Sequence, residues 1–381
     1  MSGIETTPFE DGSSMFLHDL PVEVLLLILK NCSAQDLVAI GQTCSHFRNI
    51  IASDTLWKSV CIKDFSVKTL GRIKSYYNLY SKLLHKHGWM LGTYHCQIEP
   101  YGGLFEIRYQ DEEIHGINLL ADASRPTGPL TEYLMFIIKS SEHDPQCVIN
   151  SNTYHTGKIT KTGEKTFTYI CENTSAHGEE ETEHMDIYEG MGLREGIIYK
   201  RIDIQNDQKL PQNLKLVSGN LCPQVISPGI FTAVYGGHGV EIVYFDFQNE
   251  NIIHGLKITG DPNVYSGKTT IKFDIRHQVT PSIEEQRSLD MLKSFSPHSS
   301  VPVQSIQSQR FVIPGDCQLE ADETPVPDRC IARYKADGQI AFDNFYNPSF
   351  SLVHVAVFNN DLLGAIWIDI GHFRFYHRVN K

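Results

Sequence analysis

The chain has 381 residues, and its 33 lysine and arginine residues against 45 aspartate and glutamate residues give a formal net charge of −12 at pH 7. This balance argues against a polyanion such as nucleic acid as the main partner, and no apolar run approaches the roughly 18 residues that cross a membrane. Apolar residues make up 41% of the sequence, among them nine scattered cysteines, so we expect a soluble intracellular protein with a sizeable core, whose thiols are buried or bind a metal.

Residues 16–65 are predicted to form a module of short helices. Pro21 stands where the first turn of a helix tolerates proline, and Ile28 and Leu29 follow at helical spacing. The polar, acidic residues 1–15 are expected to form a flexible tail ahead of this module.

Three further helices are expected in the module. Ser33 and Asp36 have the spacing of a capping box at the start of the second helix, and the third covers the stretch CSHFRNII. Asp54 is expected to cap the fourth helix, ahead of Trp57. Residues 66–90 continue as a helical linker.

These helices carry more apolar surface than a module of about fifty residues can bury alone. Val24, Leu27 and Ile40 are among the side chains that cannot all turn inward. The surface would be covered either by the domain that follows in the sequence or by a docked partner, and we favour a partner.

The order and spacing of apolar residues in this module resemble those of an F-box. The matching residues are Leu20-Pro21, Val24, Ile28-Leu29, Leu37, Cys44, Phe47 and Leu56-Trp57. The resemblance implies docking to the Skp-type adaptor of a cullin-RING ubiquitin ligase. The adaptor contacts that it implies are Leu20, Pro21, Ile28, Leu29 and Leu37. Cys44, Phe47 and Trp57 are expected mostly to pack the module.

From about residue 91 the period of the apolar residues falls to two. In the stretch LFEIRY, Phe105 and Ile107 alternate with Glu and Arg, and comparable strands recur along the chain between Gly, Asn and Pro turns. The expected fold class is therefore α+β, with the small all-α module followed by a large antiparallel β-barrel-like domain over 91–381. A Ser-, Pro- and Gln-rich stretch at 296–309 is expected to be a disordered loop.

Two pairs of cysteine and histidine flank polar turns in this domain. A hairpin turn at 150–152 would place Cys147 and His155 opposite each other, roughly 5 Å apart at Cβ. Cys171 and His177 flank a second short turn, and the four side chains together could hold a zinc ion. Four protein ligands leave no open coordination position, so such a site would be structural. With nine cysteines and 17 histidines in the chain, chance is the alternative explanation.

Longer stretches resemble the F-box only protein 31 family across nearly the whole chain. They are PYGG at 100–103, PGIFTAVYGGHGVEIV at 228–243, KITGDPNVYSG at 257–267 and DIRHQV at 274–279. The resemblance implies a β-barrel substrate domain with a structural zinc site at Cys147, His155, Cys171 and His177. The family also tolerates a long, variable insertion at the position of the loop 296–309.

The same resemblance implies recognition of the extreme C-terminus of other proteins, including the tails of D-type cyclins and chains that end in a primary amide. A buried carboxylate suits a terminal amide and a cation suits a terminal carboxylate, and Asp261 and Lys257 supply both groups around Thr259. The glycines of YGGHG permit close backbone approach and leave Tyr235 and His238 to line a cavity. The alternatives are an ordinary Asp-Pro-Asn turn and a hydrogen-bonded loop histidine.

The motifs of common enzyme classes, GxSxG, HExxH and the P-loop, are missing from the sequence. We therefore expect a non-catalytic substrate receptor in the cytoplasm, the nucleus or at the centrosome, which joins an adaptor through its helices and binds protein C-termini in its barrel, with neither nucleic acid nor membrane as a partner. The alternatives are an intracellular small-molecule-binding barrel of the lipocalin type with a structural zinc, and a zinc hydrolase.

Overall fold

The computed structural model describes residues 16–122, 125, 127–139, 146–149, 153–171, 197–202, 225–249, 251–295, 308–320 and 324–379. They fall into two compact units, one of which holds the N-terminal helices up to Leu91 and the other nearly all of the strands. The predicted tail at 1–15 lies outside the described residues, as does most of the predicted loop at 296–309, of which Gln309 belongs to strand β13 (Gln309–Arg310). No helix in the described ranges is both long and apolar enough to cross a membrane.

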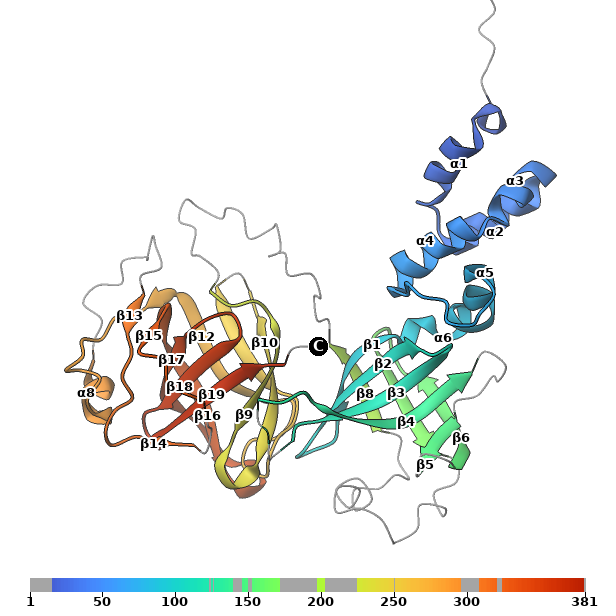
Figure 1. The fold of residues 1–381 in the computed structure, drawn as a ribbon. Helices are drawn as coiled ribbons and strands as arrows, with labels where there is room; N and C mark the ends of the chain where they lie inside the picture. The colour runs from blue at the N-terminus through green and yellow to red at the C-terminus, as the bar shows by residue number, and fades with distance from the viewer. Residues whose placement is uncertain are drawn as a thin grey trace, which may run out of the picture. The chain divides into compact units, whose positions relative to one another are not determined.

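Short helices form the N-terminal unit, as predicted (Figure 1). They are η1 (Leu17–Asp19), α1 (Val22–Leu29), α2 (Ala34–Thr43), α3 (Ser45–Ile51), α4 (Asp54–Phe65), α5 (Tyr76–Leu79), η2 (Tyr80–Leu84), α6 (His85–His87) and η3 (Gly88–Met90). The capping box of α2 is confirmed, because the Asp36 amide donates to Ser33 Oγ at 3.1 Å and the Ser33 amide donates to Asp36 Oδ2 at 3.2 Å. The prediction for Asp54 is wrong, since Ser53 holds the cap position and the Asp54 carboxylate instead accepts a hydrogen bond from the Tyr77 amide.

The first strands form a closed antiparallel barrel, in which β1 pairs with both β2 and β8 (Figure 1). They are β1 (Gly92–Gln97), β2 (Leu104–Gln110), β3 (Glu113–Leu120), β4 (Thr131–Lys139), β5 (Gln146–Ile149), β6 (Thr153–Lys161), β7 (Thr166–Cys171) and β8 (Ile197–Ile202). Rings from strands that are not neighbours meet inside it, with Tyr94 and Phe167 at 4.9 Å and Phe105 and Phe136 at 5.9 Å between centroids. This packing favours an interior filled by side chains over a lipocalin-type ligand cavity.

The later strands form a second sheet in the order β14-β19-β18-β17-β16-β12-β11-β10-β9. They are β9 (Gly229–Val234), β10 (Val240–Phe247), β11 (Ile252–Lys257), β12 (Thr269–Gln278), β14 (Gln318–Leu319), β16 (Ala332–Phe342), β17 (Tyr346–Val357), β18 (Leu362–Trp367) and β19 (His372–Arg378). Strand β19 also pairs with β9, His377 lying opposite Thr232. This pairing closes the sheet into a ring, with β14 outside, which we call the C-terminal ring. The predicted β-barrel-like architecture is thus divided between two closed sheets.

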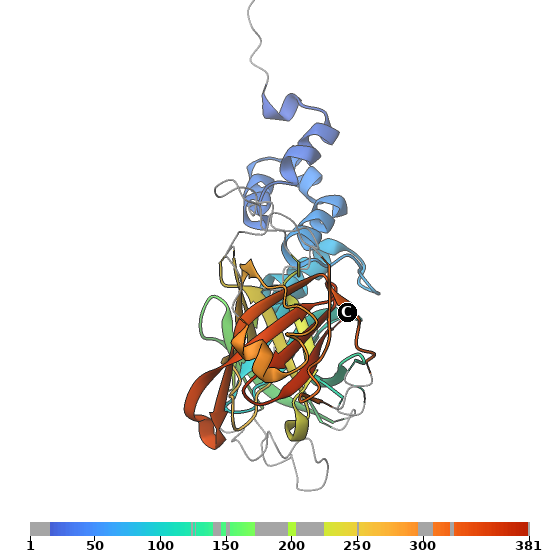
Figure 2. The same cartoon turned by 90° about the vertical axis from the view of Figure 1, so that its left-hand side faces the viewer.

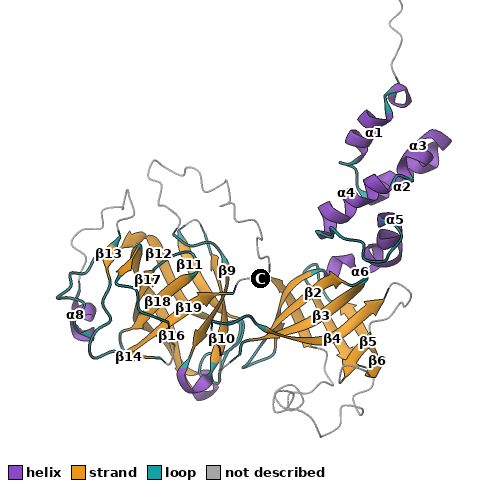
Figure 3. Cartoon of the chain, viewed as in Figure 1, coloured by secondary structure: helices purple, strands orange, loops and turns teal. Residues whose placement is uncertain are grey.

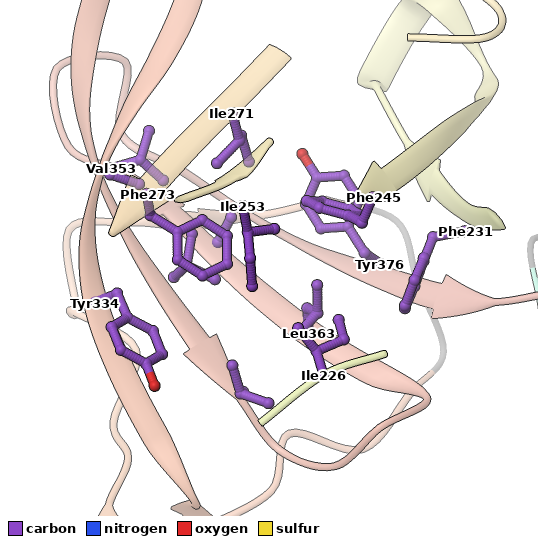
Figure 4. Packing of buried hydrophobic residues seen from close by; sticks show 14 of the residues in the cluster. Ile226, Phe231, Phe245, Ile253, Ile271, Phe273, Tyr334, Val353, Leu363 and Tyr376 are labelled. Carbon is purple, nitrogen blue, oxygen red and sulfur yellow. The ribbon is translucent and has the colours of Figure 1, made fainter. Parts of the chain in front are cut away.

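The inside of the C-terminal ring holds a large apolar core (Figure 4). Strand β12 shows the same period of two as the stretch LFEIRY, because Ile271, Phe273 and Ile275 are all buried. Phe245 and Tyr376 approach the same interior from other strands, with ring centroids 5.4 Å apart. The core therefore fixes which residues of each strand face inward.

A second apolar layer covers the outside of the ring, formed by residues 281–295, 308–313 and 328–331, and we call it the covering layer. It includes α8 (Leu289–Ser294), β13 and β15 (Arg329–Cys330), and Leu292 and Phe311 pack with apolar residues on the outer face of β17 to β19. Figure 2 shows α8, in orange, in front of the ring strands. Among the described residues after Leu91, helix is limited to α8 and short 3-10 turns (Figure 3). Strands β18 and β19 and residues 353–357 of β17 are consequently buried on both faces, whereas residues 346–350 of β17 are exposed.

Candidate functional site

The exposed apolar face of α1 is the first candidate surface. Leu27 is 62% exposed and Ile28 is 42% exposed, and Val24 and the preceding Leu17 are exposed as well. This confirms the excess of apolar surface predicted from the sequence. Apolar residues gathered on the surface mark a protein contact.

For two of the residues that the resemblance assigned to the adaptor contact, the structure shows a different role. Leu29 and Leu37 are buried within the helical unit, where they pack the helices and do not face a partner. Pro21 is exposed and Leu20 is half-buried at the start of α1, so both remain candidate contacts together with Ile28.

The residues expected to pack the module behave differently from one another. Trp57 is buried, and its indole N–H donates to the Ile51 carbonyl at 2.9 Å. Phe47 is half-buried. Cys44 is exposed at the junction of α2 and α3, which contradicts its expected packing role.

The backbone of β5, β6 and β7 fixes the relation between three predicted metal ligands. Cys147 pairs with His155 across β5 and β6, as the predicted hairpin requires, and Cys171 pairs with Gly157 across β6 and β7. Because residues two apart on a strand share a face, the register places Cys147, His155 and Cys171 on one face of the sheet. His177 and the side chains of the other three lie outside the described part of the structure. Within that part, no group of three or more His, Cys, Asp and Glu residues could hold a metal ion.

The second candidate site is a cluster of charged side chains buried inside the C-terminal ring. Lys257, the last residue of β11, is 1% exposed, and its Nζ lies 2.7 Å from Glu241 Oε2 and 2.5 Å from Asp261 Oδ2. Glu241 lies on β10, two residues before the core residue Val243, and so occupies an inward position. Asp261 also accepts a hydrogen bond from the Val264 amide at 2.8 Å. The predicted tail contacts Lys257 and Asp261 are therefore an ion pair in the free protein.

Tyr235 contacts two cations of this cluster. Its ring centroid lies 4.4 Å from Lys257 Nζ and 4.1 Å from Arg374 Cζ. The turn that follows it, YGGHG, places Gly236 at φ +56° and Gly239 at φ +81°, a conformation that favours glycine. This tight turn is what allows Tyr235 to point into the ring at the end of β9.

Two other predicted tail contacts lie outside the cluster. His238 is exposed on the turn η6 (Gly236–His238), so it does not line a cavity beside Tyr235. Thr259 is half-buried, and its hydroxyl accepts a hydrogen bond from the Ile242 amide at 2.6 Å. Its role in this structure is to tie the segment after β11 to β10.

Arg374 and Trp367 bring unpaired N–H groups into the same interior. Arg374 lies on β19 opposite the core residue Ala365, and its guanidinium carbon is 5.2 Å from the Trp367 ring centroid. Arg374 Nη2 approaches Glu320 Oε1 only to 3.7 Å. In the described part of the chain, Arg374 Nε and Trp367 Nε1 are buried without a hydrogen-bond partner. Since buried donors normally find acceptors, they mark a place where a ligand oxygen would be stabilised. We call Tyr235, Glu241, Lys257, Asp261, Trp367 and Arg374 the interior cluster.

The pKa values of the two carboxyl groups of the interior cluster shift in opposite directions. Burial raises the pKa of Glu241 to about 8, although the charge of Lys257 opposes this effect. Burial also acts to raise the pKa of Asp261, but its hydrogen bond with Glu241 and the charge of Lys257 hold that pKa well below the ordinary value. Glu241 is thus the neutral acid and Asp261 the carboxylate.

Glu241, Trp367 and Arg374 were not identified from the sequence. The sequence could have indicated that Glu241 points inward, because in the strand VEIVYFDF it lies two residues before the buried Val243 and therefore on the same face. The sequence gives no such signal for Arg374. Its neighbour Phe373 is also buried, against the covering layer, so alternation along β19 does not show which residues face the interior of the ring.

Both candidate sites lie in stretches of the chain that match known protein families. Residues 17–63 match the family model described as F-box-like, and residues 199–381 match the Cyclin D1 binding domain. The chain is 26% identical to F-box only protein 31 of Rattus norvegicus, 26% to F-box only protein 31-B of Xenopus laevis and 25% to F-box only protein 31 of Homo sapiens. Each match covers 95% of this chain and 83 to 84% of the relative.

The chain is similar to F-box only protein 31 over nearly its whole length. The F-box-like match contains the exposed face of α1, and the Cyclin D1 binding domain match contains the whole C-terminal ring with its interior cluster. F-box proteins are generally non-catalytic adaptors, and the two matched models are of binding modules. Together the matches support a substrate-recognition role in a Skp-cullin-F-box ubiquitin ligase.

Proposed function

We propose that the chain is a substrate receptor whose C-terminal ring binds the C-terminal end of a protein, such as the tail of a D-type cyclin or a chain that ends in an amide. Its helical module would dock through α1 on a Skp-type adaptor and so join a cullin-RING ligase in the cytoplasm or nucleus. The observation that carries the proposal is the pair of unpaired donors, Arg374 Nε and Trp367 Nε1, beside two buried carboxyl groups.

The chemistry of a chain end matches these groups. A terminal carboxylate offers oxygens to Arg374 and Trp367, and a guanidinium binds it with charge-assisted hydrogen bonds. A terminal amide offers a carbonyl oxygen to the same donors and N–H groups to the Asp261 carboxylate. An internal segment lacks these terminal groups, so the cluster favours the end of a chain.

We also propose a structural zinc ion at Cys147, His155, Cys171 and His177. Two thiolates and two imidazoles are the donor set that zinc prefers, and the strand register that puts three of these positions on one face fits such a site. When bound, the ion would link β5, β6 and β7 without taking part in a reaction.

A peptide-binding experiment tests the tail proposal. The full-length chain, purified with a Skp-type adaptor, is titrated with labelled cyclin-tail peptides that end in a carboxylate, in a carboxamide, or in several added residues. We expect the first two to bind and the extended peptide to bind at least about tenfold more weakly, because its end no longer reaches the cluster. Equal binding of the extended peptide would contradict recognition of a chain end.

A matched pair of arginine variants locates the binding. Arg374→Met should weaken binding of both chain ends about tenfold or more, since truncating one partner of a buried charge contact typically costs at least 2 kcal/mol. Arg276→Met changes an exposed arginine of the same ring and should leave affinity unchanged. Equal affinities of the two variants would place the site elsewhere.

A further inference from the structure

A second buried cation lies on the opposite side of the ring wall from the interior cluster. Arg333, on β16, is fully buried between the ring and the covering layer, and its Nη1 donates to Gln286 Oε1 at 2.9 Å. Its guanidinium carbon lies 5.4 Å from the Phe311 ring centroid. Among the described residues, its Nε and Nη2 have no hydrogen-bond partner. Two nitrogens of a buried guanidinium are therefore left without an acceptor.

His354, on the neighbouring strand β17, shows the same deficit. It is fully buried, and neither of its ring nitrogens has a partner within the described ranges. The register pairs Lys335 with His354 and Arg333 with Ala356, which places all four residues on the same face. Lys335 is partly buried there and donates to the Phe295 carbonyl at 2.6 Å. Two basic side chains and an imidazole thus share one covered face.

Among the described residues, Arg333 forms no ion pair with a carboxylate that would balance its charge. The acid that acts on its pKa there is the Cys330 thiol. Burial raises the pKa of Cys330 to about 11, so the thiol is uncharged at neutral pH. Burial lowers the pKa of Arg333 only to about 10, so the guanidinium keeps its charge.

Within the described part of the chain, the buried groups around Arg333 and His354 therefore lack both a balancing negative charge and hydrogen-bond acceptors. A buried charge without a partner is strongly unfavourable, and buried N–H groups are normally satisfied. Burial lowers the pKa of His354 to about 2, so its ring is neutral and carries a single N–H donor. A water molecule would accept hydrogen bonds but would bring no charge. A small anion supplies both, because it carries the missing charge and accepts from several N–H groups.

We propose that Arg333 and His354 form a binding site for a small inorganic anion such as chloride, enclosed between the outer face of β16 and β17 and the covering layer. The anion would accept hydrogen bonds from Arg333 Nε or Nη2 and from the imidazole N–H of His354. It would stabilise the attachment of the covering layer to the ring. The site does not depend on tail recognition, since it lies on the other face of the sheet.

Thermal melting of the full-length chain tests this proposal. Chloride is raised from about 1 to 100 mM, with sodium gluconate keeping the ionic strength constant. We expect the Tm of the parent chain to rise by about 4 °C, because a ligand that binds the native state stabilises it. Arg333→Met should lose this rise, whereas Arg310→Met, which changes an exposed arginine of the covering layer, should keep it.

Crystals grown in sodium bromide give the decisive observation. An anomalous bromide peak within hydrogen-bond distance of Arg333 and His354 supports the proposal, including the case in which Arg333→Met fails to fold. A water molecule at that position without a bromide peak overturns it. A chloride response that persists in both Arg333→Met and His354→Phe overturns it as well.

Discussion

Under the proposed function, the raised pKa of Glu241 affects which chain ends the interior cluster can bind. As a neutral acid, Glu241 can donate a hydrogen bond as well as accept one, whereas its carboxylate can only accept. Lys257 is then balanced by Asp261 alone. A terminal carboxylate can therefore approach Arg374 without opposition from a second negative charge on Glu241.

The same proton makes stability depend on pH. The pKa of Glu241 is about 8 in the folded chain and starts from 4.5 as its ordinary value, so between roughly pH 5 and 8 the folded state binds the proton that the unfolded state has released. Stability should fall as the pH rises through this window, with a slope that approaches about 1.4 kcal/mol per pH unit. Glu241→Gln removes the titrating group, and its free energy of unfolding, measured in urea, should lack this contribution.

Glu284→Gln is the matched control, because Glu284 is exposed. Its stability should follow the parent chain across the whole range. If Glu241→Gln and the parent have parallel pH profiles between pH 5 and 8, Glu241 is ionised in the folded protein and the assignment of the proton is wrong.

At the scale of elements, three adjacent strands bring together residues that are distant in sequence. The β5–β6 pairing sets Cys147 against His155, and the β6–β7 pairing brings Cys171 within one strand step of them. Backbone pairing therefore sets the register of three of the four proposed zinc ligands, and an ion bound there would add stability to the barrel.

Metal analysis of purified protein tests this arrangement. The parent chain should contain about one zinc per molecule, and Cys147→Ser should lose most of it and melt several degrees lower, because a structural ion stabilises only the folded state. Cys44→Ser, at an exposed thiol, should keep both the zinc and the Tm. Full zinc content in Cys147→Ser would show that the ligands lie elsewhere.

Sequence patterns predicted helices and strands well where one face of the element is buried and the other is exposed to solvent. The alternation in β2 and β12 and the capping box of α2 are such local signals, and the structure contains all of them. The division into two closed sheets could not be predicted, because pairing partners such as β12 and β16 are separated by the covering layer in sequence. In the interior cluster, Lys257 and Asp261 were found through a short local motif. Arg374 was not, because the covering layer buries the other face of its strand.

The two candidate binding sites of the molecule lie in different units. The exposed face of α1 belongs to the helical unit, and the interior cluster belongs to the unit that contains the strands. The two family matches follow the same division, with an F-box-like region and a Cyclin D1 binding domain. Each function should therefore be removable without the other.

Variants of the full-length chain can show this separation. Leu27→Asp combined with Ile28→Asp should abolish co-purification of the Skp-type adaptor, because charged groups replace exposed apolar contacts, and should leave peptide affinity unchanged. Arg374→Met should show the reverse pattern. Lys82→Asp, at an exposed position of the helical unit, is the control for added negative charge. Loss of both activities in either variant would argue against independent units.

The closure of the C-terminal ring by β19 also has a consequence for biosynthesis. The first and last strands of the ring become neighbours only when β19 pairs with β9, so a nascent chain on the ribosome exposes two open sheet edges until β19 has emerged. Arg374 lies on this final strand. A transcript with a premature stop codon before β19 would therefore yield a product without Arg374, whose guanidinium is proposed to bind substrates. The open sheet edges of this product would also promote aggregation.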